Sequence, residues 1–108
     1  MVCVLCQYEL SPDPGVMAQY SAWMAGEGVK QVLALPGLQE FHAYREYSAV
    51  NPRITAMLFF EDLRSALQVA SSEVWLTMVS NLTRWGSVGA QISVLEPSPL
   101  LPQPLRPA

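Results

Sequence analysis

Basic side chains are scarce in this sequence, and those present are scattered. Six Lys and Arg residues stand against nine Asp and Glu residues in a chain of 108, which gives a net charge of −3. Nucleic acids and anionic membrane surfaces are bound by grouped Lys and Arg side chains. We therefore expect neither a nucleic acid nor a membrane as a partner.

Long hydrophobic runs are also missing. No apolar stretch approaches the ~18 residues that a membrane-spanning helix needs. No basic segment precedes a hydrophobic stretch at the N-terminus, as one does in a signal peptide. A cytoplasmic location is the expectation that follows.

Metal-ligating side chains are too few for a zinc site within one chain. The only cysteines are Cys3 and Cys6 and the only histidine is His42, whereas a structural zinc ion takes about four such ligands. The C-x-x-C spacing is typical of redox centres at helix N-termini, but here it lies in the β-rich run VCVLCQYE. In a strand, residues three apart point to opposite faces at roughly 10 Å, beyond the ~7 Å limit of a disulfide. We expect two buried thiols in a reducing compartment, with no metal and no cofactor.

Apolar side chains, by contrast, are abundant. Hydrophobic residues make up 51% of the chain and charged residues only 14%. A chain of this length can form one core, and so few charges cannot cover the whole outside of it. Part of the apolar surface is therefore expected to close against a partner subunit.

Hydrophobic periodicity and turn residues predict four strands and two helical regions. Asp13 and Asp62 are the expected N-caps of the two helical regions. The order β-α-β-β-α-β is that of an α+β, ferredoxin-like fold, in which both helices cover one face of a four-stranded antiparallel sheet. The predicted strands span residues 2–9, 38–47, 53–61 and 87–95, and the helical regions span 14–35, with a kink near Gly26 and Gly28, and 63–85, with a break at Ser71-Ser72.

The predicted strands are apolar on both faces. In the first strand Val4 and Cys6 alternate with Cys3 and Leu5, and the third contains the run ITAMLFF. Two-sided hydrophobicity in an antiparallel sheet implies that both faces are buried. Because the helices cover only one face, we expect a homodimer that packs sheet on sheet.

Proline divides the chain into a domain, residues 1–96, and a C-terminal arm, residues 97–108. The arm holds five of the nine prolines, so it is expected to be extended. The favoured explanation is that it lies against the body or the partner subunit. The alternative is that its two P-x-x-P spacings bind another protein.

Several short motifs occur at defined places within residues 1–96. They are Pro36-Gly37 before the second strand, Phe41 and Arg45 in that strand, Phe60-Glu61-Asp62 at the end of the third, and Ser71-Ser72 in the second helical region.

Together with the element order, these motifs resemble the dimeric α+β barrel superfamily, and within it the antibiotic-biosynthesis-monooxygenase type of domain. The resemblance implies the ferredoxin-like fold and a range of activities: cofactor-independent oxygenases of polycyclic aromatic substrates, haem-degrading enzymes, lactone isomerases and proteins without known activity. The haem-degrading branch uses an axial histidine on a helix, so a single histidine in a predicted strand disfavours it.

His42 is the side chain best suited to proton transfer at physiological pH. It shares strand parity with Tyr44, so both side chains are expected on one face of the sheet, with Arg45 on the other. We predict His42 as the acid/base and Tyr44 as its hydrogen-bonding aid. The alternative is a structural histidine in the sheet or at a dimer interface.

An apolar pocket between helices and sheet is the predicted substrate site. The leading hypothesis is a homodimeric cofactor-independent enzyme, monooxygenase-like or isomerase-like, that acts on a small hydrophobic molecule of aromatic or polyketide-like character. The alternatives are a non-catalytic ligand-binding or stress-associated dimer, and an interaction module that uses the arm. The candidate lining residues, which are equally typical of a plain core, are Tyr20, Trp23, Met57, Phe59 and Trp75.

Overall fold

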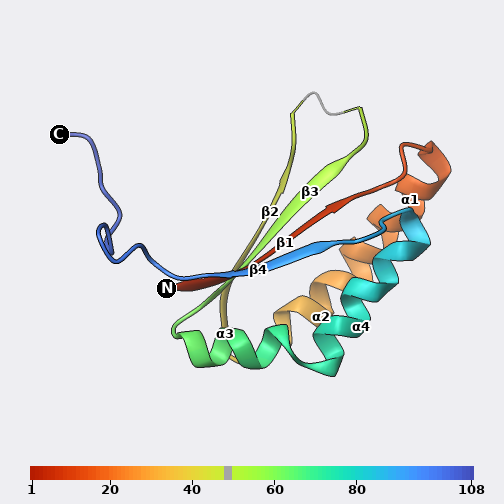
Figure 1. Cartoon of the computed structure of the whole chain (residues 1–108). Helices are drawn as coiled ribbons and strands as arrows, with labels where there is room; N and C mark the ends of the chain where they lie inside the picture. The colour runs from red at the N-terminus through yellow and green to blue at the C-terminus, as the bar shows by residue number, and fades with distance from the viewer. Residues whose placement is uncertain (48–49) are drawn as a thin grey trace.

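Helices cover one face of a single antiparallel sheet in this protein (Figure 1). The computed structural model describes residues 1–47 and 50–108. The sheet has four strands in the order β2-β3-β1-β4, and all neighbouring pairs are antiparallel. This arrangement confirms the predicted α+β, ferredoxin-like fold. In chain order the elements are β1 (Val2–Glu9), α1 (Pro14–Trp23), η1 (Met24–Gly28), α2 (Val29–Leu33), β2 (Leu38–Arg45), β3 (Arg53–Phe60), α3 (Leu63–Ala70), α4 (Glu73–Asn81), η2 (Leu82–Trp85) and β4 (Gln91–Leu95).

Side-chain oxygens cap the three longer helices. The Asp13 carboxylate accepts a hydrogen bond from the backbone N–H of Val16 at 3.0 Å, and Asp62 accepts one from Ser65 at 2.8 Å. The second bond holds the pKa of Asp62 below its ordinary value. Ser72 Oγ begins α4 by accepting from Trp75. Local capping therefore sets where these helices start, as the two aspartates predicted.

The predicted kink in the first helical region is a π-helical turn, η1, between α1 and α2. Such turns insert an extra residue into a helix and occur often at functional sites. A β-carbon at Gly28 would lie 2.8 Å from Trp23 Cζ3 and 2.9 Å from Met24 Sδ. Glycine is therefore needed at this position because two large side chains pack directly against its backbone.

β4 is shorter than predicted and begins at Gln91. Gly86 has φ 91°, a left-handed conformation, and the N–H of Ser87 returns to the carbonyl of Leu82 at 3.2 Å. These residues complete the end of η2 instead of starting a strand. β2 likewise ends at Arg45, two residues before the predicted boundary.

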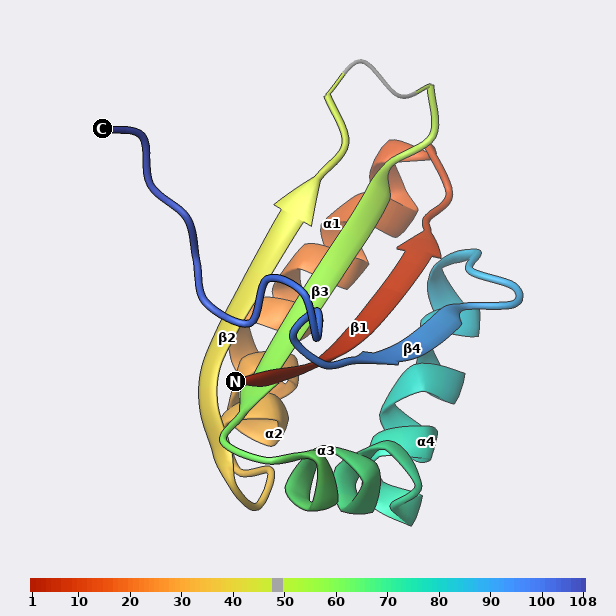
Figure 2. The same cartoon turned by 60° about the vertical axis from the view of Figure 1, so that its left-hand side comes forward.

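The two faces of the sheet differ sharply in burial. Toward the helices, Val4, Cys6, Leu58 and Phe60 are fully or almost fully buried. None of the described helices covers the other face, which Figure 2 shows with the helices behind it. We call it the open face. It carries Cys3, Leu5 and Gln7 of β1, Thr55, Met57 and Phe59 of β3, His42 and Tyr44 of β2, and Ser93 and Leu95 of β4.

The open face is the part of the sheet that the predicted homodimer would cover. Leu5, Met57 and Phe59 are only half-buried there, and Tyr44 is exposed. One chain by itself buries only the helix side, so burial of the second face by a second copy stays a prediction. Cys3 is the exception, since it is buried although it lies on the open face.

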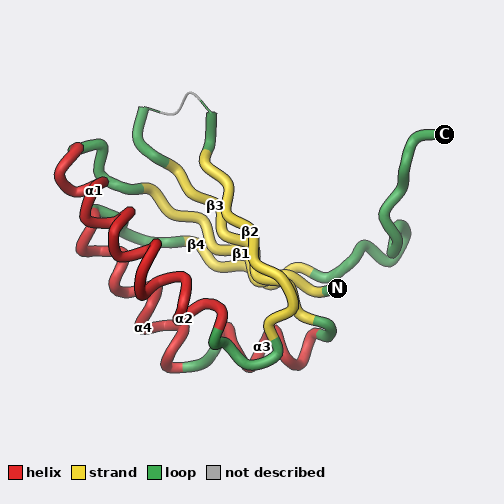
Figure 3. Tube along the Cα trace, turned by 180° about the vertical axis from the view of Figure 1, so that it is seen from behind, coloured by secondary structure: helices red, strands yellow, loops and turns green. Residues whose placement is uncertain are grey.

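The C-terminal arm runs away from the sheet (Figures 1 and 3). Residues 96–108 are all exposed. A local turn interrupts the extended chain where Ser98 Oγ accepts hydrogen bonds from the N–H groups of Leu100 and Leu101. The arm therefore does not pack on its own body, which leaves the partner subunit or another protein as its predicted contact.

No helix within residues 1–47 and 50–108 combines the length and the apolar character needed to cross a membrane.

Candidate functional site

A small cavity lies between the helices and the sheet, and we call it the helix-side cavity. Its volume is about 40 Å³, enough for a water molecule or two but far below the roughly 300 Å³ of ordinary ligand pockets. A ligand must therefore displace side chains. Twelve residues line it: Cys6, Tyr8, Trp23, Met24, Val32, Phe41, Ala56, Leu58, Trp75, Met78, Val79 and Leu82.

The rim of the helix-side cavity is the part able to move. Trp23, Met24, Phe41 and Val79 are half-buried, whereas the deeper lining residues are buried. Methionine is unbranched and readily changes rotamer, and Met24 begins the π-helical turn η1. The least buried part of the wall is therefore formed by η1, β2 and α4.

Trp75 lines the helix-side cavity and has a buried polar group. It lies in the first turn of α4, where Ser72 Oγ accepts from its backbone N–H at 3.2 Å. The side chain is only 4% exposed, and its Nε1–H has no hydrogen-bond partner among the described residues. An unpaired buried donor costs roughly 1–3 kcal/mol.

Tyr8 brings a second polar group. Its Oη lies 2.6 Å from the Oη of Tyr20, a buried hydrogen bond between β1 and α1. Burial raises the pKa of both phenols, and for Tyr8 the neighbouring Tyr20 adds to the effect. Both phenols are therefore neutral at physiological pH.

The two cysteines are free and buried, as expected for thiols on opposite faces of a strand. Burial raises the pKa of Cys6 to about 11. Burial also raises the pKa of Cys3, opposed by a hydrogen bond to the backbone of Leu58. Neither is a thiolate at neutral pH, so neither has the character of a reactive cysteine.

His42 and Tyr44 lie together on the open face, but not as predicted in detail. Their rings are stacked with centroids 6.3 Å apart and an interplanar angle of 8°. Glu40 Oε2 lies 2.9 Å from His42 Nε2, within ion-pair distance, and the Phe59 ring packs edge-on against His42 with centroids 5.6 Å apart. Sequence reasoning missed Glu40, although its i, i+2 spacing from His42 predicts one shared face of the strand.

The structure does not bring the predicted substrate-binding residues together. Trp23 and Trp75 line the helix-side cavity. Tyr20 does not line it but is hydrogen-bonded to Tyr8, which does. Met57 and Phe59 lie on the open face with His42, because Met57 pairs with His42 in the β2–β3 register. The sheet separates these two groups.

Sequence reasoning also missed Tyr8 and Cys6 as lining residues. Both belong to the same parity of β1 as Val4, and both line the helix-side cavity. The signal available was the alternation along β1, which places Cys6 and Tyr8 on one face. That signal does not say which face meets the helices.

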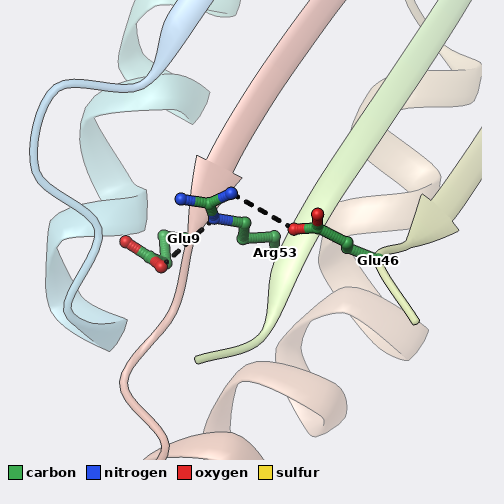
Figure 4. Close-up of polar contacts among 3 residues, drawn as sticks. All are labelled: Glu9, Glu46 and Arg53. Carbon is green, nitrogen blue, oxygen red and sulfur yellow. Dashed lines mark hydrogen bonds and ion pairs between the residues drawn. The ribbon is translucent and has the colours of Figure 1, made fainter. Parts of the chain in front are cut away.

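Charged side chains gather at the end of the open face where β1 ends and β3 begins. Arg53 Nε lies 3.3 Å from Glu9 Oε1, and its Nη1 lies 3.3 Å from Glu46 Oε2 (Figure 4). The two carboxylates raise the pKa of Arg53. Within the chain, Glu40 thus pairs with His42 and Glu46 pairs with Arg53.

Within the described part of the chain, no group of three or more His, Cys, Asp or Glu side chains is arranged to hold a metal ion.

No protein-family profile matches the sequence, and a search of curated proteins finds no relative. The structure, however, is similar to many solved ones. A proposed antibiotic biosynthesis monooxygenase from Deinococcus radiodurans superimposes with a TM-score of 0.74 at 9% identity, over 100% of this chain and 99% of that one. SnoaB, a cofactor-independent oxygenase from Streptomyces nogalater, superimposes with a TM-score of 0.62 at 15% identity, over 94% and 97%.

A third similar structure is an EthD family protein from Bacillus halodurans, with a TM-score of 0.65 at 10% identity over 91% and 100% of the two chains. At such low identities the likeness concerns the fold. The chain thus has the same fold as solved antibiotic-biosynthesis-monooxygenase-like proteins, which is the fold that its sequence resemblance implied.

Proposed function

We propose that this chain is a small homodimeric enzyme of the cofactor-independent monooxygenase or isomerase type, located in the cytoplasm. Its substrate is a small hydrophobic molecule of aromatic or polyketide-like character. The observation that carries the proposal is the helix-side cavity, whose walls include the aromatic side chains of Trp23, Phe41 and Trp75. The similarity of fold to SnoaB, a cofactor-independent oxygenase, supports the reaction class.

The helix-side cavity suits a substrate that supplies its own reactivity. Its titratable lining groups, Cys6 and Tyr8, both have raised pKa values and stay neutral. A neutral apolar wall excludes water and leaves electron donation to an electron-rich substrate. This fits oxygenation of a phenol-bearing aromatic better than general-base chemistry inside the cavity.

The partner in this proposal is a second copy packed on the open face. Leu5, Met57 and Phe59 form a half-buried apolar strip there. Burying such a strip is favourable at roughly 25 cal/mol per Å² of apolar surface. The exposed C-terminal arm then reaches across to the second copy.

An acid/base role for His42, aided by Tyr44, is the second candidate. The observation that favours it is the 2.9 Å contact between His42 Nε2 and Glu40 Oε2, since a carboxylate orients an imidazole for proton transfer. Both side chains face away from the helix-side cavity, so this role places the substrate at the interface between the two open faces. The non-catalytic alternative is a dimer that holds a ligand in the cavity without converting it.

A pair of matched variants tests the proposal. Ala56 lines the helix-side cavity, and its cross-strand partner Ala43 is exposed. Ala56→Val fills the cavity, whereas Ala43→Val adds the same methyl groups outside it. The assay is oxygen uptake with 1,8-dihydroxyanthrone, whose oxidation to the anthraquinone consumes one O₂ and releases one water.

We expect Ala56→Val to slow uptake by about tenfold or more, because small displacements in a site are costly. Ala43→Val should stay within about twofold of the unmodified protein, as surface changes usually do. Equal rates for both variants would remove the cavity from the reaction. Substrate bound in native mass spectrometry without any oxygen uptake would favour the non-catalytic alternative, and loss of uptake in His42→Ala alone would favour the open face.

A further inference from the structure

A second recess, larger than the helix-side cavity, lies at the end of the open face where β1 ends and β3 begins. Its volume is about 580 Å³, which is within the range of ordinary ligand pockets. Amide, hydroxyl, carboxylate and guanidinium groups all contribute to its lining. We call it the polar groove, and the proposed function makes no use of it.

Two rows of polar side chains cross the sheet at the polar groove. In the first row, Gln7 of β1 pairs with Thr55 of β3 on one side and with Gln91 of β4 on the other. Thr55 pairs in turn with Tyr44 of β2. Paired residues place their side chains on the same face, with β-carbons roughly 5 Å apart. The first row therefore offers uncharged donors and acceptors across all four strands, and all its members line the groove.

The second row is charged and lies two residues further along β1. Arg53 pairs with Glu9, and the carbonyl of Arg53 accepts from the backbone N–H of Glu46 at 2.9 Å. The Arg53 guanidinium lies between the two carboxylates, with Nε 3.3 Å from Glu9 Oε1 and Nη1 3.3 Å from Glu46 Oε2. All three side chains are about half exposed, so these contacts add little to stability. Their consequence is that the plane of the guanidinium is held in one orientation at the groove.

The charged row keeps donors and acceptors that its own ion pairs do not use. A guanidinium has more N–H donors than two such contacts require, and each carboxylate has a second acceptor oxygen. Arg53 Nη2 takes no part in either ion pair (Figure 4). Glu9 Oε2 and Glu46 Oε1 are likewise outside these two pairs. The row therefore presents an acceptor, a donor and a second acceptor in sequence.

The charges of the polar groove balance, because two arginines and two glutamates line it. The groove therefore favours neither an anion nor a cation. A hydroxyl group both donates and accepts a hydrogen bond, so neighbouring hydroxyls on a rigid ring match a wall of mixed donors and acceptors. Tyr44 adds an apolar plane beside this wall, since its side chain is 59% exposed and its ring is stacked on His42.

We propose that the polar groove binds a neutral polyhydroxy compound, specifically a sugar ring. Arg53 and its two carboxylate partners hydrogen-bond the ring hydroxyls, and the C–H face of the ring packs on Tyr44. The apolar strip that the proposed second copy covers lies toward the other end of the open face, since Leu5 is four residues from Glu9, roughly 13 Å along β1. This site is additional to the helix-side cavity and does not depend on the proposed function.

Titration of the ¹⁵N-labelled protein with the methyl glycosides of glucose, galactose and mannose tests the proposal. The side-chain amide resonances of Gln7 and Gln91, which line the groove, report binding. Methoxycyclohexane is the control ligand, because it has a ring of the same size and the methoxy group but no hydroxyl. Arg53→Lys keeps the charge and removes the planar guanidinium, and Arg64→Lys makes the same change on α3, outside the groove.

We expect at least one glycoside to shift both amide resonances saturably in the millimolar range, and methoxycyclohexane to leave them in place. Arg53→Lys should raise the dissociation constant of that glycoside about five- to tenfold, as expected for the loss of one hydrogen bond. Arg64→Lys should stay within about twofold of the unmodified protein.

The absence of a saturable shift with all three glycosides would overturn the proposal. Equal binding of methoxycyclohexane would do the same, because the hydroxyl groups would then not be recognised, and so would equal effects of the two arginine variants. Should Arg53→Lys not fold, Glu46→Gln takes its place, since it keeps the side-chain shape but replaces an acceptor with a donor, and it should weaken binding similarly. Oxygen uptake is measured separately, so failure here is distinguishable from failure of the proposed function.

Discussion

The phenol oxygens of Tyr8 and Tyr20 lie 2.6 Å apart in the core, where both side chains are 8% exposed. This contact joins β1, an inner strand of the sheet, to α1. The Tyr20 ring in turn packs edge-on against Trp85, with ring centroids 5.7 Å apart. A polar bond at the back of an apolar cavity holds Tyr8 in one position. It therefore matters both for stability and for the shape of the helix-side cavity.

Removing the second of these hydroxyls should cost little once the first has been removed. Tyr8→Phe leaves the Tyr20 hydroxyl buried and unpaired, so we expect the free energy of unfolding to fall by roughly 1–3 kcal/mol. Tyr20→Phe should do the same. The double variant should lose little more than either single one, giving a coupling energy of about 1 kcal/mol or more in a urea-denaturation cycle. Strict additivity would show that the bond contributes nothing.

Two glycines of the π-helical turn should respond in opposite directions to alanine. A β-carbon at Gly26 meets nothing within 4 Å, whereas one at Gly28 lies 2.8 Å from Trp23 Cζ3. Gly26→Ala should raise the free energy of unfolding by roughly 0.4–1 kcal/mol, because alanine lowers the conformational entropy of the unfolded chain. Gly28→Ala should lower it by roughly 1–3 kcal/mol through overpacking. Thermal unfolding of the pair provides the measurement, and equal shifts would contradict the packing described at Gly28.

Alkaline pH should destabilise the fold through Cys6. Its pKa rises from an ordinary 9.0 to about 11 in the folded protein, so above pH 9 the unfolded chain loses this proton first. The stabilisation is complete below pH 9 and is lost as the pH rises toward 11, by up to about 3 kcal/mol. The raised pKa values of Tyr8 and Tyr20 act in the same direction above their ordinary value of 10.0.

Urea denaturation between pH 7 and 10 checks the contribution of Cys6. Cys6→Ala should flatten the loss of stability between pH 9 and 10, whatever its effect on stability at pH 7. An unchanged slope in this variant would show that the thiol is not protected by burial.

A lysine on the open face should separate the proposed dimer. Phe59 is half-buried there, and Phe59→Lys would place an unpaired ammonium group in the interface. We expect the dissociation constant of the dimer to rise roughly 100-fold or more. Light scattering after gel filtration measures this change. Leu67→Lys is the matched control, because Leu67 is 49% exposed on α3 in the helical layer. Equal effects of both variants, or a monomer before any change, would reject this interface.

Local patterns in the sequence were sufficient to predict most of the elements. β1 has the predicted bounds, and Asp13 and Asp62 cap the helices they were predicted to cap. These features depend on residues only a few positions apart, which is why alternation and capping rules find them. The start of β4 was misplaced because Ser87 bonds back to Leu82, a helix-end geometry that an apolar run does not signal.

The candidate site was harder to predict because it depends on pairing between distant segments. Met57 and Phe59 were assigned to one pocket with Trp23 and Trp75, yet the sheet lies between them. β3 is apolar at both parities, so its sequence does not indicate which side chains meet the helices. The stacking of His42 on Tyr44 and the pairing with Glu40 likewise depend on rotamers.

The sequence by itself thus determined the order of strands and helices, the caps and the extended C-terminal arm, because each depends on interactions within a few residues. Only the tertiary structure decided that His42 lies on the open face, away from the helix-side cavity, and that the Trp75 side chain is buried with no hydrogen-bond partner for Nε1 in residues 1–47 and 50–108. Both facts arise from the register of β3 between β1 and β2 and from the packing of α4. That information is spread over side chains far apart in the chain, and it exists only once they are brought together.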